Sequence, residues 1–264
     1  MDEATYRADE RPSVTQLAKL LQMPPLHARH EWQKPPTPAM EFGTAVHTAI
    51  LESDEFEHRY VAAPQVDRRT KAGKADWTAF EAQNEGKIIL SAEDHGRATT
   101  IAGNVFDSEA DAYLQRMDQV EVPLFGKLHG VPFKGRPDAF ATSGVMRGVM
   151  VEIKTTSTLA TRRNFEKSIA DFGYGFQAAG YRILAEQNGH AIRHMLYVVC
   201  ETKPPFGVAL FRMMDEVVDW YRPRVEEAID TYHYCIRTNS WPGHPNEIQE
   251  VGLPAWHEAS RQLA

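Results

Sequence analysis

Residues 134–156, KGRPDAFATSGVMRGVMVEIKTT, constrain this chain more than any other stretch, because they combine a two-strand pattern with charged side chains. The pattern predicts one strand over 133–142 and a second over 148–154, with Ser143-Gly144 as the turn between them. The second strand is apolar except near its end, where an acid and a base lie two residues apart. This hairpin therefore carries a candidate site.

Asp138 falls on the first strand, and Glu152 and Lys154 fall on one face of the second, because side chains alternate along a strand. Mg²⁺ prefers carboxylate and carbonyl oxygens and keeps waters that can serve as nucleophile. We expect Asp138 and Glu152 to hold a cation, with the Ile153 carbonyl as a further ligand. Lys154 would orient the attacking water or stabilise charge on a phosphate. The pattern resembles the P-D…E-x-K motif of restriction-endonuclease-like nucleases; the alternative is a surface hairpin with an ion pair.

Length and composition predict a single domain over residues 1–264, with 42% hydrophobic residues to form a core. We expect residues 1–12 to be disordered and the tail, 241–264, to pack on the core. The chain has no run of 18 apolar residues and no basic-then-apolar start, so we expect neither a membrane span nor a secretory signal. Two cysteines fit a reducing compartment, which predicts a cytoplasmic protein.

The net charge of −7 argues against a protein that coats nucleic acid by bulk charge. A nuclease stays possible, because a metal site concentrates carboxylates and the DNA track needs only a local basic lining. One candidate lining is a basic loop that contains Arg68, Arg69, Lys71 and Lys74. The alternative is a solvated loop without a partner.

In the first half of the chain, two predicted helices bear on the site. Ser13 and Gln16 indicate a capping box for a helix that Pro24-Pro25 ends, and a second helix covers 40–52. His47 lies at the edge of the apolar stripe of the second helix, where it is either a metal ligand or phosphate contact, or a hydrogen-bonded half-buried histidine.

The middle of the chain predicts a long helix over 91–116, a strand over 119–125 and a strand over 127–134, with the turn at Gly126. Glu121 stands on the first of these strands. An isolated acid in a strand usually faces solvent, but Glu121 would complete the metal shell if its strand borders that of Asp138.

The second half predicts a helix over 161–172, with Phe172 on its inner face, and another over 176–188. Two strands over 194–201 and 208–213 and a helix over 215–237 follow. Gln177 and Tyr181 lie one turn apart and either reach the site or form a surface polar pair. Arg162 and Arg163 face either phosphates or water. The order of elements predicts an α/β fold, a central mixed β-sheet flanked by helices.

Taken together, these segments resemble the RecE-like (exonuclease VIII-type) phage and prophage exonucleases, within the PD-(D/E)xK superfamily of lambda exonuclease and the RecB nuclease domain. The resemblance covers most of the chain. It rests on FGTAVHTAILE, EFEHRYV, RRTKAGK, VEVPLF, KGRPD, VEIKTT, FGYGFQAAGY and WPGHP…LPAW, in this order. One departure is visible, since members closest to exonuclease VIII often have D-x-K where this chain has E-I-K.

The resemblance implies a PD-(D/E)xK nuclease core and an active centre. The residues that it places there are His47, Glu121, Asp138, Glu152, Lys154, Gln177 and Tyr181. Arg136, in the K-G-R-P-D segment, is a further candidate DNA contact. It also implies Mg²⁺-dependent digestion of linear duplex DNA from the 5′ end, with Mn²⁺ as a substitute, to leave 3′ overhangs for recombination. A ring-shaped homo-oligomer, a single-strand annealing partner of the RecT/Red-beta type and a phage or prophage origin follow from the same source. The alternatives are a structure-specific or site-specific endonuclease on the same core, and a DNA-end-binding scaffold without turnover.

Overall fold

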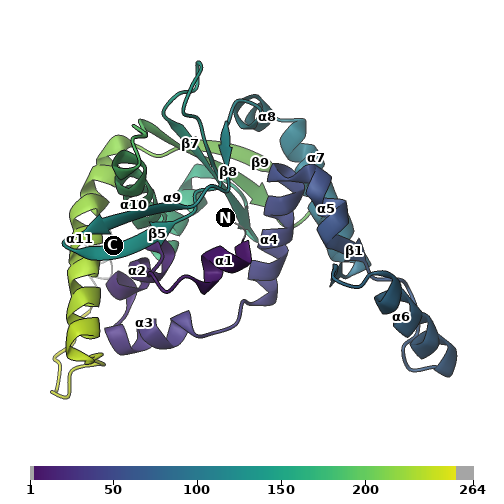
Figure 1. The fold of residues 1–264 in the computed structure, drawn as a ribbon, viewed down its shortest axis with the longest axis horizontal. Helices are drawn as coiled ribbons and strands as arrows, with labels where there is room; N and C mark the ends of the chain where they lie inside the picture. Colours follow the sequence, from purple (N-terminus) through teal and green to yellow (C-terminus); the bar gives the residue numbers. More distant parts are fainter. Residues whose placement is uncertain (1–2, 254–264) are drawn as a thin grey trace, which may run out of the picture.

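The computed structural model describes residues 3–253, and its centre is a five-stranded sheet with helices on both faces (Figure 1). β7 and β8 are parallel, and the other neighbouring strands are antiparallel. This arrangement confirms the predicted fold class, an α/β fold with a mixed sheet between helices. The strands, in their order across the sheet, are β3 (Gln119–Val120), β6 (Ala139–Phe140), β7 (Val149–Thr156), β8 (His194–Glu201) and β9 (Val208–Arg212).

The central strands are apolar on both faces because each face packs against a separate core. Along β8, Met195, Tyr197 and Val199 belong to one core, and the alternate residues Leu196 and Val198 belong to the other. This explains the near-continuous apolar run that predicts a central strand here.

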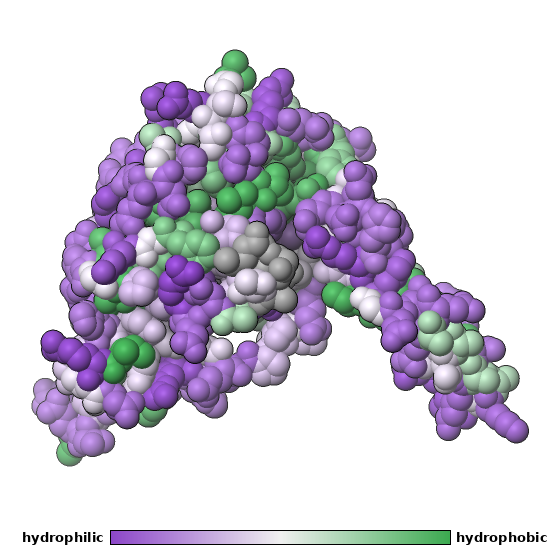
Figure 2. All heavy atoms as spheres, in the orientation of Figure 1, coloured by the Kyte–Doolittle hydropathy of each residue, from purple (hydrophilic) through white to green (hydrophobic). Residues whose placement is uncertain are grey.

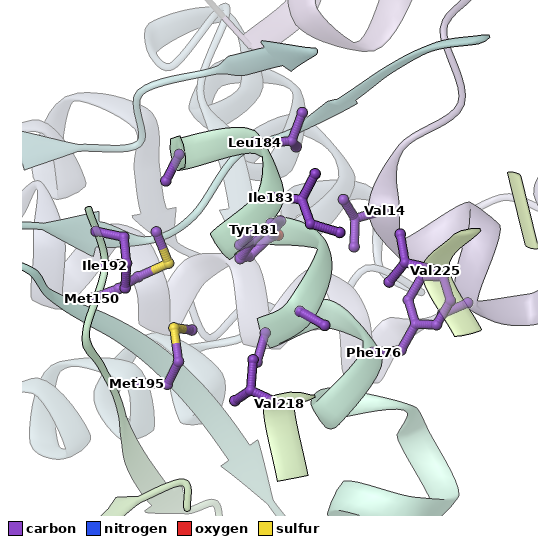
Figure 3. Close-up of a cluster of buried hydrophobic side chains, with 14 of the residues drawn as sticks. Val14, Met150, Phe176, Tyr181, Ile183, Leu184, Ile192, Met195, Val218 and Val225 are labelled. Atoms are coloured by element: carbon purple, nitrogen blue, oxygen red, sulfur yellow. The ribbon is translucent and has the colours of Figure 1, made fainter. Parts of the chain in front are cut away.

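On the first face, four helices pack together. They are α2 (Val14–Gln22), α9 (Arg162–Phe172), α10 (Tyr174–Gln187) and α11 (Asp215–Thr238). Figure 3 shows α10 in the middle of this core, with its own Phe176 and with Val14 and Val225 from neighbouring helices. Gly180 permits a close approach of α10 to α2, because a Cβ atom at this position would lie 2.5 Å from a methyl carbon of Val14. The capping box of Ser13 and Gln16, predicted from sequence, starts α2.

The second face is covered by α4 (Pro38–Leu51) and α7 (Ala92–Phe106), with the short helices α5 (Ser53–Arg59) and α8 (Glu109–Leu114) beside them. The predicted helix over 91–116 is therefore two helices. Asp107 ends α7, and Ser108 starts α8 by accepting a hydrogen bond from the Ala110 N–H.

A separate hairpin of β4 (Leu124–Leu128) and β5 (Val131–Gly135) holds the first residues of the chain. The buried Lys134 ammonium donates to the carbonyls of Tyr6 and Asp9, and the Lys134 N–H donates to Pro12. Residues Glu3–Ala8 form the helix α1. The sequence predicts disorder over residues 1–12, whereas the structure has a helix and an anchored segment over residues 3–12.

Two further predictions about this region are wrong. Pro137 and Asp138 lie between β5 and β6, so the predicted strand over 133–142 is two strands in two sheets, and Asp138 precedes β6. The hairpin turn lies at His129-Gly130, where both residues have positive φ, and not at Gly126.

An arm leaves the second face at the parallel pair of β1 (Tyr60–Ala62) and β2 (Ile88–Leu90). Its helix α6 (Lys71–Gln83) projects from the body at the lower right of Figure 1. Because Thr70 caps this helix, Lys71 and Lys74 lie on a helix and not in the predicted loop.

Other sequence-based predictions concern single residues of the remaining segments. Pro25 begins the helix α3 (Pro25–Trp32), although Pro24-Pro25 was expected only to end a helix. Phe172, predicted to face inward, is 64% exposed. Trp241 packs on Trp32, whereas Trp256 lies outside the described residues. Within residues 3–253, none of the helices has the length and apolar character that crossing a bilayer requires.

Candidate active site

The predicted acids lie on β7 and next to β3 and β6 of the central sheet, beside a cavity of about 1050 Å³. The cavity is walled by α2, α4, the segment after β3 and the start of α10. His47 from α4 and Asp138 line it together with Lys154, which lies near the end of β7. Residues from helices on both faces of the sheet thus meet at one point.

His47, Glu121 and Asp138 form the one group in the described part of the chain whose ligand atoms could share a metal ion. One side-chain atom from each lies within 4.8 Å of the others. His47 Nδ1 is 3.4 Å from an Asp138 carboxylate oxygen. Two carboxylates and an imidazole form a suitable donor set for a divalent cation, so these residues fit the metal that the motif implies.

Glu121 reaches this group through an unusual backbone. It follows β3 with a φ of +50°, in the left-handed region that few non-glycine residues adopt, and its N–H donates to the Asp138 carbonyl over 2.9 Å. The strand that Glu121 follows pairs with β6, so it does border the Asp138 segment. Arg136 Nε contacts the Glu121 carboxylate at 2.7 Å.

Asp138 and Glu152 hold each other through the backbone. The Asp138 N–H donates to Glu152 Oε1 over 3.1 Å, and the Ile153 N–H donates to Asp138 Oδ2 over 2.6 Å. Glu152 is 1% exposed and lies outside the group of His47, Glu121 and Asp138. Its role as a metal ligand, like that of the Ile153 carbonyl, stays a prediction.

Lys154 lies next to the acids of the site and lines the same cavity. Its ammonium donates to the second oxygen of Glu152 over 2.8 Å and lies 5.1 Å from the ring centre of Tyr174. Burial disfavours the charged ammonium, but the carboxylates of Glu152 and Asp138 outweigh this effect and raise the pKa of Lys154. A permanently charged group therefore lines the cavity beside the acids.

Two acids in the site hold protons more tightly than usual. Burial raises the pKa of Glu121 to about 7, and the charge of Asp138 adds to the effect. Burial and Asp138 also raise the pKa of Glu152 to about 7. Burial opposes the charge on His47, but Asp138 outweighs it and raises the histidine pKa. A cation that binds here must displace protons.

Gln177 and Tyr181 face the interior and are not the surface pair of the alternative interpretation. Both are buried, and the Gln177 side-chain N–H donates to the Tyr181 hydroxyl over 3.1 Å. The Tyr181 hydroxyl donates in turn to the Arg136 carbonyl over 3.3 Å. Gln177 lines the cavity, and Tyr181 supports the backbone just before Asp138.

The other predicted DNA contacts lie away from the cavity. Arg68, Arg69, Lys71 and Lys74 lie on the arm. Arg162 and Arg163 begin α9, where Arg162 pairs with Glu166 on the surface. Among the predicted basic residues, Arg136 and Lys154 line the cavity in the described structure.

Sequence reasoning missed the wall that α2 contributes. Thr15, Lys19 and Gln22 line the cavity at a spacing of four and three residues, which places them on one face of the helix. The periodicity of the apolar residues predicts this helix. The same periodicity places the polar residues together on the opposite face, but no role was assigned to them. The Lys19 side chain forms no salt bridge or hydrogen bond within the described residues, although Glu31, which pairs with Lys34, is close enough to feel its charge.

The chain is similar to known proteins in its sequence profile and in its fold. The profile of a family described as "PDDEXK-like domain of unknown function (DUF3799)" matches residues 13–252. A crystal structure of a candidate exonuclease from Eubacterium rectale superposes with a TM-score of 0.64 at 13% identity, covering 98% of each chain. A phage-related exonuclease from Haemophilus somnus 129PT gives a TM-score of 0.34 at 12% identity, covering 87% of this chain and 96% of that one. No curated protein sequence matches the chain.

Proposed function

This chain belongs to the PDDEXK-like family DUF3799, and on that premise we propose that it is a nuclease that uses a divalent metal to hydrolyse DNA. The observation that carries the proposal is the convergence of His47, Glu121 and Asp138 to within 4.8 Å beside a charged Lys154. Four residues from separate segments of the chain meet in one cavity.

His47, Glu121 and Asp138 would hold the cation directly. Glu152 is the next candidate ligand, because its carboxylate touches the Asp138 N–H. A divalent cation bound there would polarise the scissile phosphate and lower the pKa of a bound water.

The chain's own groups would orient the reactants. The Lys154 ammonium is fixed by Glu152 and would donate its remaining hydrogens to a water or phosphate oxygen in the cavity. The Ile153 N–H fixes Asp138 in place, and Tyr181 fixes the backbone at Arg136. The reacting atoms would thus meet groups that are already oriented, which lowers the entropic part of the barrier.

Substrate binding within the cavity would involve α2. Lys19 is a lysine of the cavity wall without a carboxylate partner among the described residues, so a DNA phosphate is its natural counter-ion. Such contacts are independent of sequence and sensitive to salt.

The finer part of the proposal is an exonuclease with Mg²⁺ or Mn²⁺ as cofactor. It would digest linear duplex DNA from the 5′ end, act as a ring-shaped oligomer and serve a single-strand annealing protein. The support for this part is the resemblance to RecE-like exonucleases, and the candidate exonuclease from Eubacterium rectale shares the fold.

The test is release of nucleotides from linear duplex DNA labelled at one 5′ end, with Mg²⁺, beside a closed circular duplex and the Lys154→Ala protein. We expect loss of the linear DNA from its ends, an intact circle, and cleavage at least ~10²-fold slower by the Lys154→Ala protein. Early release of the label would support digestion from the 5′ end.

Two other outcomes would favour the alternatives. Cutting of the circle would favour an endonuclease on the same core. A scaffold would be favoured by two results together: the protein binds DNA ends without metal, and it shows no cleavage that depends on Lys154.

A further inference from the structure

We propose that the α6 arm, residues 63–87, is a second DNA-binding element that holds the duplex several base pairs from the cut. This inference rests on the proposed nuclease function and adds a substrate contact outside the cavity. Figure 1 shows the arm projecting from the body. Gly73 is the one buried residue of α6, so the helix contributes almost nothing to either core.

The tip of the arm carries a cluster of exposed cations, and Figure 2 shows its hydrophilic end. Arg68, Arg69, Lys71 and Lys74 lie within seven consecutive residues, and all are exposed. Lys71 and Lys74 have no carboxylate partner within the described residues, whereas Arg69 pairs with Asp67. The arm also has four acids: Asp67 and Asp76 lie near these cations, and Glu81 and Glu85 lie toward the other end, near β2.

These cations stand on an ordered scaffold. The Thr70 N–H and hydroxyl both donate to the Asp67 carbonyl, and the Thr70 hydroxyl accepts from the Gly73 N–H. A Cβ atom at Gly73 would lie 2.1 Å from the Asp67 carbonyl oxygen, so only glycine allows this packing. The Arg68 guanidinium lies 4.1 Å from the centre of the Trp77 ring. The tip is therefore preorganised, which lowers the entropic cost of binding.

The arm starts at the rim of the active-site cavity. Arg59, the last residue of α5, lines the cavity, and Tyr60 begins β1 at the base of the arm. Lys87 ties the other end of the base to α5 by donating to the Glu57 carbonyl. Because α6 has 13 residues, its length is about 20 Å, or about six base pairs of duplex at ~3.4 Å each.

Charge decides which partner fits this surface. An interface between copies of a chain has an apolar core with few charged residues. On α6 only Trp77 and Phe80 are large apolar residues, both partly covered, and the tip is basic. A polyanion therefore matches the tip, and duplex DNA is the polyanion that the proposed cavity acts on.

The test variant is Lys71→Glu/Lys74→Glu, which changes two exposed side chains without partners. A matched control, Lys127→Glu/Lys203→Glu, makes the same charge change at exposed positions elsewhere. Affinity for a linear duplex is measured without divalent cation at several salt concentrations. Hydrolysis of bis(p-nitrophenyl) phosphate with Mg²⁺ or Mn²⁺ reports the chemistry on a substrate too small to reach the arm.

With one phosphate contact per lysine, we expect affinity to fall roughly 60-fold at about 0.1 M salt, and the slope of log K against log salt to become shallower by about 1.8. The control should bind like the unmodified protein, and all three proteins should hydrolyse the small diester equally. Unchanged duplex affinity and slope in the arm variant would overturn the inference. So would weaker binding that follows from a changed oligomeric state in sedimentation, because the arm would then contact a second copy.

The two proposals fail separately. An unmodified protein that hydrolyses neither duplex nor small diester would count against the nuclease, while the binding measurements would still decide the role of the arm.

Discussion

The N–H of Asp138 donates to the carboxylate of Glu152 over 3.1 Å, so the two acids of the motif are joined by a backbone contact across β6 and β7. Each acid then has a different task. Asp138 keeps an oxygen 3.4 Å from His47, whereas Glu152 accepts from Asp138 and from Lys154. Substitutions at these positions should therefore have different effects.

Asp138→Asn should reduce cleavage at least ~10³-fold, because loss of the negative charge removes several kcal/mol of metal-dependent stabilisation. The Asn side-chain oxygen still accepts from the Ile153 N–H, so the fold should persist. Single-turnover rates and circular dichroism measure the two effects. A variant that is folded and fully active would contradict the assignment of Asp138. Lys34→Ala, which breaks a surface pair with Glu31, serves as control.

Lys154→Met should lower kcat by roughly 10²-fold, the usual effect of losing one oriented donor in an active site. The methionine chain fills the same space, but Glu152 loses its cation and its pKa should rise further. Cleavage rates over a range of pH values measure this change. Activity equal to the unmodified protein at every pH would show that the lysine is structural only.

Lys19→Ala should raise KM by less than about tenfold and leave kcat unchanged, because a phosphate contact away from the cut binds ground state and transition state equally. The salt dependence of duplex binding should become shallower by about 0.9. Steady-state kinetics at two salt concentrations provide both values. A fall in kcat with constant KM would instead place Lys19 at the reacting phosphate.

Without metal, stability should fall as the pH rises from about 5 to about 8. Burial raises the pKa of Glu121 and of Glu152 from 4.5 to about 7, so over this window the folded state holds protons that the unfolded state has released. The raised pKa of His47 acts in the same direction. Mg²⁺ needs the deprotonated ligands, so it should raise the Tm more at the higher pH.

Thermal unfolding at both pH values, with Mg²⁺ and with chelator, measures this linkage. The Glu121→Gln/Glu152→Gln protein is the control, because its stability should depend less on pH and respond less to Mg²⁺. An equal Mg²⁺ effect at the two pH values in the unmodified protein would contradict the prediction.

Gly180→Ala should destabilise the fold by about 1–3 kcal/mol, although alanine favours helices, because its Cβ would lie 2.5 Å from Val14. The matched control is Gly103→Ala on α7, where no atom lies within 4 Å of the added Cβ. This control should gain about 0.5–1 kcal/mol. Urea unfolding measures the free energy of unfolding of both variants. A change of the same sign at both positions would contradict the prediction.

Hydrophobic periodicity predicts most of this fold. The run over β8 and the capping box at Ser13 each identify an element, because they depend on local patterns. The helix α3 was missed because Pro25 can either end a helix or begin one, and only packing decides. Phe172 follows the apolar stripe of α9 but is exposed beside the cavity, which no periodicity reveals.

The site was predictable where it follows strand alternation. Glu152 and Lys154 do share a face, and they touch. The left-handed backbone at Glu121 was not predictable, since it depends on the pairing of β3 with β6. The contribution of the polar face of α2 to the site was also not predictable. Sequence periodicity shows that Lys19 lies on a polar face, but only the tertiary structure shows that this face lines a cavity.

The two cores on opposite faces of the sheet have a consequence for cooperativity. His47 belongs to a helix of one core, whereas Gln177 and the α2 wall belong to the other. If one layer loosens, its half of the site separates from Asp138 even while the sheet stays paired. A molecule in which only one layer is packed would therefore lack part of the candidate site.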